Sequence, residues 1–364
     1  MLPGVAALAA VLFSWIQVGQ VSKELRISDE GQITNRFNTA IGHLGASSMH
    51  VRIGGIYALN RIVQDSQRDN PAVTSVLSAY IREEAPLATK KPAQSEKYLA
   101  PPDDVSAALA VLANRPESPW PSIANLRNVN LRGLETPSVP LLSGSNARNF
   151  RKADLSGSDL HDSKLDEFDF EEADFSSADF SDAWLTRSDL HNTTAMFANF
   201  TNATFVGSDL SGTRMDSANL TGAFFSEAAG KMWVGKGSSE HTVGSANLTA
   251  AILPGVNFTR ADLRGVNLKK AWLGGANFTD ANLTGANLQG ATLADDTKRY
   301  GTGVTRLTRI SLVSADLRNA DLRGADLRNA DLRGADLRGA KLAGARIKGA
   351  KIDKHTRGLP ASTV

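Results

Sequence analysis

Residues 150–180 read FRKADLSGSDLHDSKLDEFDFEEADFSSADF, and a large apolar residue returns at every fifth position from Phe150 onward. The spacing continues to Phe225 without a slip of register. Of the sixteen positions, fifteen hold Leu, Phe or Met, and Ala195 is the exception. Two residues before most of them stands a small residue, and an Asp or Asn usually lies between. The repeating unit is therefore a small residue, Asp or Asn, a large apolar residue and two polar positions.

A period of five fits neither the 3.6-residue turn of an α-helix nor the two-residue alternation of a strand. No ordinary helix or strand could keep these apolar side chains on one buried face. The repeat must itself be the structural unit, with the large and small residues pointing inward as the chain winds. Stacked turns of such a chain bury a narrow continuous core, and this predicts a solenoid.

The same pattern recurs in two further blocks with new registers, over 246–293 and 312–352, and a short prelude stands at Ala124–Leu131. We therefore expect a repeat domain over 123–352. The shifts of register predict loops at 136–147, 226–245 and 294–309, followed by a C-terminal tail at 353–364.

These units resemble the pentapeptide-repeat family, whose members fold as a right-handed, four-sided β-helix with four repeats in each coil. The resemblance implies that residues twenty apart stack in one column, and that the units fill about nine coils. Two residues depart from the pattern, Phe168 at a small position and Ala195 at a large one, and a local bulge or small void is expected at each. Four pairs with the twenty-residue offset should form aromatic ladders: Phe150/Phe170, Phe180/Phe200, Phe205/Phe225 and Phe258/Phe278.

The composition of the 364-residue chain is that of a globular protein, with 41% apolar and 21% charged residues. It has no cysteine, which excludes disulfides and thiolate metal sites. The net charge of +2 hides an asymmetry along the repeats. Residues 148–225 contain six basic and fourteen acidic side chains, whereas residues 306–357 contain thirteen basic and six acidic ones. The rod is therefore expected to be acidic near its start and basic near its end.

Residues 1–21 predict a transmembrane helix. They contain no charged side chain, and about twenty mostly apolar residues are long enough to cross a bilayer. A cleaved signal peptide is one alternative, although no Lys or Arg precedes the apolar run, and a buried amphipathic helix is another. Lys23 and Arg26 follow the run directly. By the positive-inside rule, the rest of the chain is expected in the cytoplasm, anchored to the cytoplasmic (inner) membrane.

Residues 22–117 are expected to be α-helical, with a linker rich in Pro and Lys at 87–102. The apolar spacing predicts helices over 29–44, 49–65, 70–82 and 103–114, the last with Asp103 as its N-cap. The segments 30–37, 51–59 and 104–109 resemble those that precede the repeats in a group of actinobacterial, membrane-associated pentapeptide-repeat proteins. Two hydrophobic helices commonly stand before this region in such relatives, whereas one is visible here, which leaves open a true N-terminus further upstream.

No catalytic, metal or cofactor site can be singled out from the sequence. The six histidines lack metal-ligand spacing, and the many aspartates are explained as outward-pointing members of ladders. Gly54-Gly55 lies in a helical stretch with no preceding strand, which argues against a phosphate-binding loop. We therefore expect a protein that is not an enzyme and needs no cofactor.

The candidate interaction residues are five arginines, Arg318, Arg323, Arg328, Arg333 and Arg338, and three tryptophans, Trp184, Trp233 and Trp272. Each arginine has an aspartate two residues earlier. One interpretation is charge alternation on a soluble surface, where an exposed pair contributes about 0–1 kcal/mol. The other is a basic patch for nucleic acid or anionic lipid, but the aspartates weaken its field and no aromatic residues interleave. Direct binding of nucleic acid is therefore not expected.

The leading hypothesis is a non-enzymatic, membrane-anchored protein whose rod presents a rigid surface to an unidentified cytoplasmic protein. The alternative comes from the resemblance, which includes quinolone-resistance and toxin-immunity proteins whose acidic rods imitate duplex DNA and bind DNA gyrase. The acidic block at 148–225 favours this alternative. The basic block near the end does not, and residues 354–364 cannot supply the short dimerising helix usual in that branch.

Overall fold

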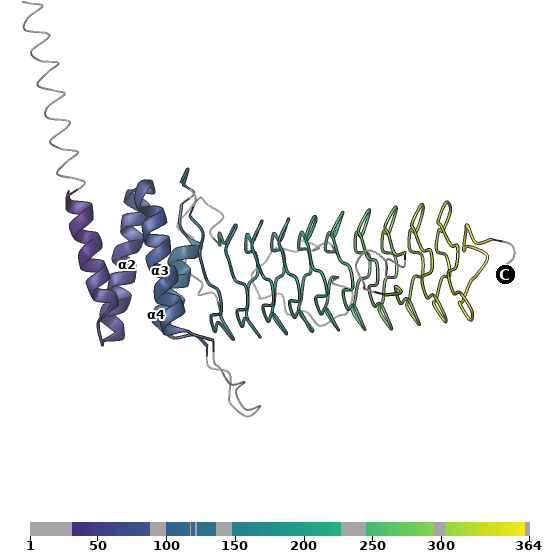
Figure 1. The fold of residues 1–364 in the computed structure, drawn as a ribbon, viewed down its shortest axis with the longest axis horizontal. Coiled ribbons are helices and arrows are strands. Elements are labelled where there is room, and N and C mark those ends of the chain that lie inside the picture. The colour runs from purple at the N-terminus through teal and green to yellow at the C-terminus, as the bar shows by residue number, and fades with distance from the viewer. Residues whose placement is uncertain are drawn as a thin grey trace, which may run out of the picture.

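The computed structural model describes residues 31–87, 100–116, 118–120, 122–135, 148–226, 245–294 and 303–360. In Figure 1 a group of helices stands at one end of a long rod, and the C-terminus lies at the far end. The expected membrane segment 1–21, the predicted loop 136–147 and Trp233 fall outside the described residues. Within the described ranges, no helix is both long enough and apolar enough to span a membrane.

Parallel backbone bridges between units four repeats apart build the rod. They form four columns, and we name the four faces A, B, C and D by the columns that begin at Asn125, Asn130, Glu135 and Asn149. The column on face A shows that the described part has ten coils, one more than expected. Its members are Asn125, Asp154, Asp174, Thr194, Arg214, Ile252, Trp272, Thr292, Asp321 and Lys341.

The corners of the coil turn through a residue in the left-handed region of backbone conformation. Asn192 has a φ of 58°, and Gly212, one coil further on, has a φ of 68°. A Cβ atom on Gly212 would lie 2.3 Å from Oδ1 of Asn192, so both space and conformation favour glycine there. Phe197 adopts the same conformation, with a φ of 60°, which is uncommon for a bulky residue. Its side chain points outward and is 66% exposed.

The predicted aromatic ladders are confirmed. The ring centroids of the four pairs lie 4.8–6.1 Å apart in stacked arrangements: Phe150/Phe170, Phe180/Phe200, Phe205/Phe225 and Phe258/Phe278. All of these rings are buried. The large and small inward residues together form one continuous core along the rod.

Phe168 and Ala195 do not disturb the coil. Phe168 is buried and stacks on Phe150 at 5.6 Å and on Phe170 at 5.3 Å between ring centroids. The bridges at Asp169 and Thr194 keep their register, so the expected bulges do not form. The extra ring at 168 extends an aromatic stack, and the backbone is not displaced.

The third repeat block begins earlier than the sequence pattern indicated. Within the predicted loop 294–309, Arg306 pairs with Asn277, and Leu307 is a buried inward residue. Thr305 takes the small position, and its hydroxyl donates a hydrogen bond to the carbonyl of Leu273 at 3.3 Å. The unit stands directly after an insertion, so no preceding repeat sets its register, and Arg306 holds the position that usually carries Asp or Asn.

The last coil also extends further than expected. Arg357 pairs with Asp336, which places part of the predicted tail 353–364 in the β-helix. The step from Lys351 to Arg357 is one residue longer than the usual five, so the five-residue pattern did not reveal it.

Asparagine side chains form hydrogen-bonded ladders along two faces. On face B the amide nitrogen of Asn219 donates to Oδ1 of Asn199 at 3.3 Å, and that of Asn199 donates to Oδ1 of Asp179 at 2.9 Å. On face D the amide of Asn247 donates to Oδ1 of Asp209 at 3.1 Å. These bonds join successive coils outside the core and satisfy polar groups that are partly buried.

The helical region contains α2 (Met49–Asp65), the short 3-10 helix η1 (Gln67–Asp69), α3 (Asn70–Glu84) and α4 (Asp103–Ala113). Residues 31–44 are also helical. Asp103 is the first residue of α4 and makes no capping bond, so its prediction as N-cap is wrong. Pro102 holds the cap position, and the acidic side chains of the first turn suit the positive end of the helix dipole.

The helical region closes the N-terminal end of the rod. The N–H of Asn149 donates to the carbonyl of Ala113 at 2.8 Å, and the N–H of Asn130 donates to that of Ala85 at 2.9 Å. The buried Arg115 side chain donates to the carbonyl of Asn149 at 2.9 Å. Burial lowers the pKa of Arg115 to about 10. The first coil thus finds in the helices the partners that a preceding coil would supply.

A buried polar cluster joins three helices. Oδ2 of Asp104 accepts hydrogen bonds from Nε of Arg52 at 2.7 Å and from the hydroxyl of Tyr80 at 2.6 Å. Oδ1 accepts from the N–H of Val105 at 3.0 Å. Burial opposes ionisation of Asp104, but the bonds from Tyr80 and Arg52 outweigh it and lower the pKa of this carboxyl. Burial, and then the bond to Asp104, raises the pKa of Tyr80.

We expect Phe180→Ala to lower the free energy of unfolding by about 3–5 kcal/mol, because the lost ring leaves a cavity in the core. Phe197→Ala is the matched control, since the same change there removes an exposed ring and should shift stability by about 0.5 kcal/mol or less. Urea unfolding followed by circular dichroism measures both. Equal effects of the two substitutions would contradict the inward register assigned to Phe180.

We expect Asp104→Asn to destabilise the helical region by about 3 kcal/mol at neutral pH, because Arg52 loses its buried partner. The pKa of Asp104 is lower in the folded than in the unfolded chain. Its stabilising contribution is therefore present above the unfolded pKa and is lost as the pH falls through the folded pKa. The difference between wild type and variant should shrink below about pH 4. A difference independent of pH would rule out an ionised Asp104.

Candidate interaction surfaces of the rod

The five predicted arginines are each held by the aspartate two residues earlier. In Arg328, Nε lies 2.9 Å from Oδ1 of Asp326, and Nη2 lies 2.7 Å from Oδ2. The other four pairs have the same two-pronged geometry: Arg318–Asp316, Arg323–Asp321, Arg333–Asp331 and Arg338–Asp336. The row therefore presents neutralised pairs.

These pairs are spread around the rod. The bridge between Asp316 and Asp336 places Arg318 and Arg338 on face D, while the other three arginines follow columns on faces A, B and C. The arginine hydrogen bond lowers the pKa of each aspartate, and that of Asp336 falls to about 2. Both partners stay charged at neutral pH, but exposed pairs of this kind contribute only about 0–1 kcal/mol each. The geometry favours a soluble, charge-alternating surface.

The two described tryptophans lie apart from each other. Trp184 is on face C in the third coil, and Trp272 is on face A in the seventh, each partly buried. Trp184 shares its column with Phe224, which is 42% exposed, and Trp272 follows Ile252, which is 36% exposed. The structure therefore does not combine the tryptophans into one patch.

The exposed apolar residues Phe197, Phe224 and Ile252 were not expected from the sequence. Phe224 and Ile252 occupy the unit position that usually holds Asp or Asn, and Phe197 occupies a polar corner position. Each of them could have been found in the sequence as a large apolar residue at a position that the repeat usually keeps polar.

Aspartates stack along the rod near its N-terminal end. On face D, Asp169, Asp189 and Asp209 occupy the same column in successive coils. Carboxylate oxygens of Asp169, Glu171 and Asp189 lie within 4.8 Å of one another. Arg151 forms ion pairs with both Asp169, at 3.5 Å, and Glu171. A guanidinium group thus already neutralises part of the negative charge that a metal ion would require.

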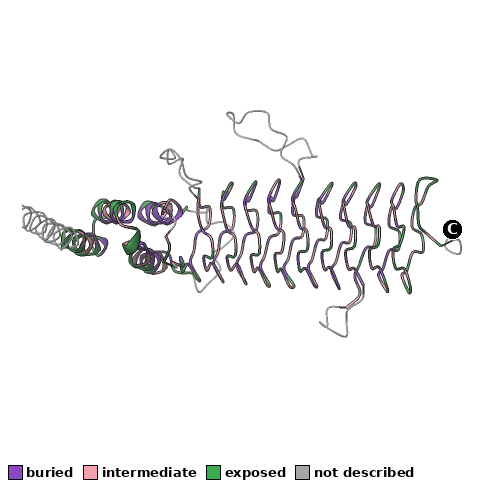
Figure 2. Ribbon diagram, turned by 90° about the horizontal axis from the view of Figure 1, so that it is seen from above, coloured by how far each residue is buried: buried purple, intermediate pink, exposed green. Residues whose placement is uncertain are grey.

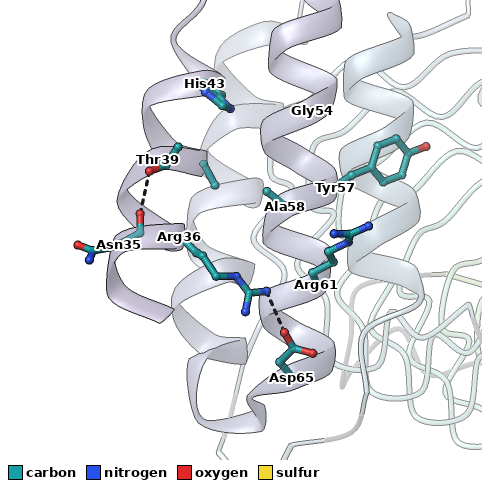
Figure 3. Close-up of a pocket in the computed structure, with 10 residues that line it drawn as sticks. Asn35, Arg36, Thr39, His43, Gly54, Tyr57, Ala58, Arg61 and Asp65 are labelled. Atoms are coloured by element: carbon teal, nitrogen blue, oxygen red, sulfur yellow. Dashed lines mark hydrogen bonds and ion pairs between the residues drawn. The ribbon is translucent and has the colours of Figure 1, made fainter. Parts of the chain in front are cut away.

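A cleft of about 780 Å³ opens in the helical region between the 31–44 helix and α2 (Figure 3). Across it Arg36 pairs with Asp65 at 2.8 Å. Beside it the two helices approach closely, since a Cβ atom on Gly55 would lie 2.8 Å from the carbonyl oxygen of Ala40. The lining residues are Asn35, Arg36, Thr39, Ala40, His43, Gly54, Tyr57, Ala58, Arg61 and Asp65. The sequence predicted no site here, and Gly55 serves helix packing whereas Gly54 lines the cleft.

Comparison with known proteins gives a family match and several structural relatives. A family model described as pentapeptide repeats matches eight copies, over residues 142–192, 196–228, 245–280, 261–295 and 307–352. None of the curated proteins matches the chain.

Three of the solved structures that match the chain are HetL, Rfr23 and QnrB1. HetL, a pentapeptide repeat protein involved in heterocyst differentiation regulation from the cyanobacterium Nostoc, is 28% identical, with 64% of this chain and 90% of HetL covered and a TM-score of 0.25. Rfr23, a pentapeptide repeat protein from the cyanobacterium Cyanothece, is 29% identical over 43% of this chain and 90% of its own, with a TM-score of 0.16. QnrB1, a plasmid-mediated fluoroquinolone resistance protein, is 19% identical over 64% of this chain and 95% of its own, with a TM-score of 0.29. With eight repeat copies matched in sequence and a four-column coil in the structure, this chain belongs to the pentapeptide-repeat family.

Proposed function

We propose that this chain is a non-enzymatic interaction protein whose rod presents a rigid flank to a cytoplasmic partner protein. The observation that supports this most is the mutual pairing of polar groups along the flank. Arg328 is held by Asp326, and Nδ1 of His191 lies 2.8 Å from the hydroxyl of Ser211 in the next coil. Side chains held in this way form a regular, preorganised surface, which suits binding through many contacts spread over several coils.

We further propose that residues 1–21 anchor the rod to the cytoplasmic membrane. The support is the uncharged apolar stretch and the cations Lys23 and Arg26 that follow it. The helical region lies at the opposite end of the molecule from the C-terminus (Figure 1). An anchor preceding the helical region would leave the flank and the far end of the rod free to meet a partner.

Deletion of Met1–Val21 should move the protein from the membrane pellet to the soluble fraction and leave the rod folded. Fractionation by ultracentrifugation after a high-salt wash measures the first effect, and circular dichroism the second. Full-length protein that stays in the pellet after the same wash is the control. A truncated protein that still sediments with membranes at high salt would show that the anchor lies elsewhere.

A second candidate function is binding of DNA gyrase by imitation of duplex DNA. The observation that favours it is the column of Asp169, Asp189 and Asp209 on face D, within a segment of fourteen acidic and six basic residues. Coils stacked at about 4.8 Å would repeat negative charge along the rod, as phosphates do along a duplex.

The anchor-free protein should bind purified DNA gyrase in the absence of DNA if this second function is correct. The binding should weaken with salt, duplex DNA should compete, and Asp189→Asn combined with Asp209→Asn should weaken it further. Surface plasmon resonance measures all three. No binding at micromolar concentrations would exclude gyrase and leave an unidentified cytoplasmic protein as the partner.

A further inference from the structure

The tip of the rod, formed by the last coil at residues 341–357, exposes part of its core. Leu342, Ile347 and Ile352 hold inward positions in this coil but are only partly buried. The corresponding leucines one coil earlier, at 322, 327 and 332, are fully buried. Figure 2 shows the last coil, next to the C-terminus, in the colours of exposed and intermediate residues. The described chain therefore ends the rod on an open apolar face.

The peptide groups of the tip are also unpaired on their outer side. One coil earlier, the N–H of Leu322 donates to the carbonyl of Lys341 at 2.9 Å, and that of Leu327 donates to Arg346 at 2.8 Å. The equivalent N–H groups of Leu342, Ile347 and Ile352 have no backbone acceptor among the described residues. Unpaired peptide groups beside exposed apolar side chains mark a surface ready for association.

A ring of positive charge surrounds this open face. Residues 341–357 carry six basic side chains and one acidic one, a net charge of +5. Within the part of the chain that the structure describes, none of the six forms an ion pair, whereas the preceding coils pair arginine with aspartate. All six are exposed: Lys341, Arg346, Lys348, Lys351, Lys354 and Arg357. The tip is therefore apolar at its centre and carries a net positive charge at its rim.

The opposite end of the same rod shows what can cover a coil of this kind. There α4 lies against the first coil (Figure 1), and its C-terminal end bonds to Asn149 through Ala113 and Arg115. The apolar residues Val105, Leu109 and Leu112 of α4 are buried. α4 is buried on nearly all sides, because α2 and α3 pack on it as well. A helix thus closes a solenoid end that lacks a neighbouring coil.

We propose that the tip binds an amphipathic helix of a partner protein, apolar on one face and acidic along its edges. The apolar face covers Leu342, Ile347 and Ile352, and the acidic edges meet the basic rim. End-to-end docking of a second copy is disfavoured, because it would bring two surfaces of net charge +5 together. The inference extends the proposed function by naming a class of partner, but it uses the tip and does not depend on the flank, on gyrase or on the anchor.

The test uses the full-length protein in nanodiscs of neutral phosphatidylcholine and a fluorescently labelled synthetic helix. The helix carries leucine on one face and glutamate on its edges, and a matched peptide carries lysine in place of glutamate. Fluorescence anisotropy should show micromolar binding of the glutamate peptide that weakens with salt. The lysine peptide should bind at least about tenfold more weakly.

Substitutions locate the binding on the rod. Lys348→Glu with Lys351→Glu reverses two exposed charges at the tip and should weaken binding of the glutamate peptide by at least about tenfold. Lys269→Glu with Lys270→Glu makes the same change of charge between faces D and A, far from the tip, and should leave binding within about twofold. Circular dichroism of both variants checks that they remain folded.

Several outcomes would overturn the proposal. No binding of the glutamate peptide, or equal binding of both peptides, would remove the acidic helix as the ligand. If the two double variants lost peptide binding equally, the net charge of the protein would account for the binding, and there would be no site at the tip. A dimer that the tip substitutions dissociate would assign the surface to a second copy. Displacement of the peptide by duplex DNA or by phosphatidylserine vesicles, but not by unlabelled glutamate peptide, would assign it to another anionic surface. The peptide measurements do not depend on whether the protein binds gyrase or attaches to a membrane. The proposal for the tip can therefore be refuted independently of the proposals for the flank, the anchor and gyrase.

Discussion

Each coil of this rod makes its backbone hydrogen bonds with the coils on either side, and the remaining features of the molecule follow from that dependence. A peptide group at the corner or side of a coil has no partner within its own turn other than the short link across the corner. The pairing partner must therefore be supplied twenty residues away, or further where an insertion intervenes. Asp209 pairs with Asn247 because the chain returns to face D after the insertion between them. Insertions are tolerated only if the chain re-enters at the next face in order, as it does from Phe224 on face C to Asn247 on face D.

The same dependence makes the two ends of the rod chemically different from its middle. At the N-terminal end the helical region supplies carbonyl acceptors and a buried arginine to the first coil. The polar cluster of Arg52, Tyr80 and Asp104 ties α2, α3 and α4 together, so the closing structure is itself held in one arrangement. At the C-terminal end the described chain offers no equivalent, and the last coil keeps its inward residues partly open.

The coil could be predicted from sequence because its signal is a strict period that no helix or strand can produce. The pattern failed where no preceding repeat set the register or where the spacing was unusual. The unit at Thr305 directly follows an insertion, and the step from Lys351 to Arg357 was one residue too long. Neither departure moves a unit to another face of the rod, because backbone pairing with the preceding coil determines the face on which the unit lies.

The candidate surfaces could be predicted only in part from the repeat pattern. The aspartate two residues before each arginine suggested neutralised pairs, and the geometry around Arg328 has that form. The bonds that Arg52 makes to Tyr80 and Asp104 span 28 and 52 residues, and no local pattern reports contacts of that range. The open tip was also hidden, because its residues match the repeat as well as those of any other coil, and only their lack of a neighbour distinguishes them.

The asparagine ladders give the rod a direction that the repeat motif alone does not have. An ionised carboxylate can only accept hydrogen bonds, whereas an asparagine amide donates from one side and accepts on the other. Asp179 therefore stands at the head of a run of amides on face B, and Asp209 does so on face D. If a coil with an aspartate were moved into the run of amides, the carboxylate would have no proton to donate to the asparagine before it, and that bond would be lost. Within the runs of asparagine, the order of coils that look interchangeable in sequence therefore matters for the outer bonds that join them.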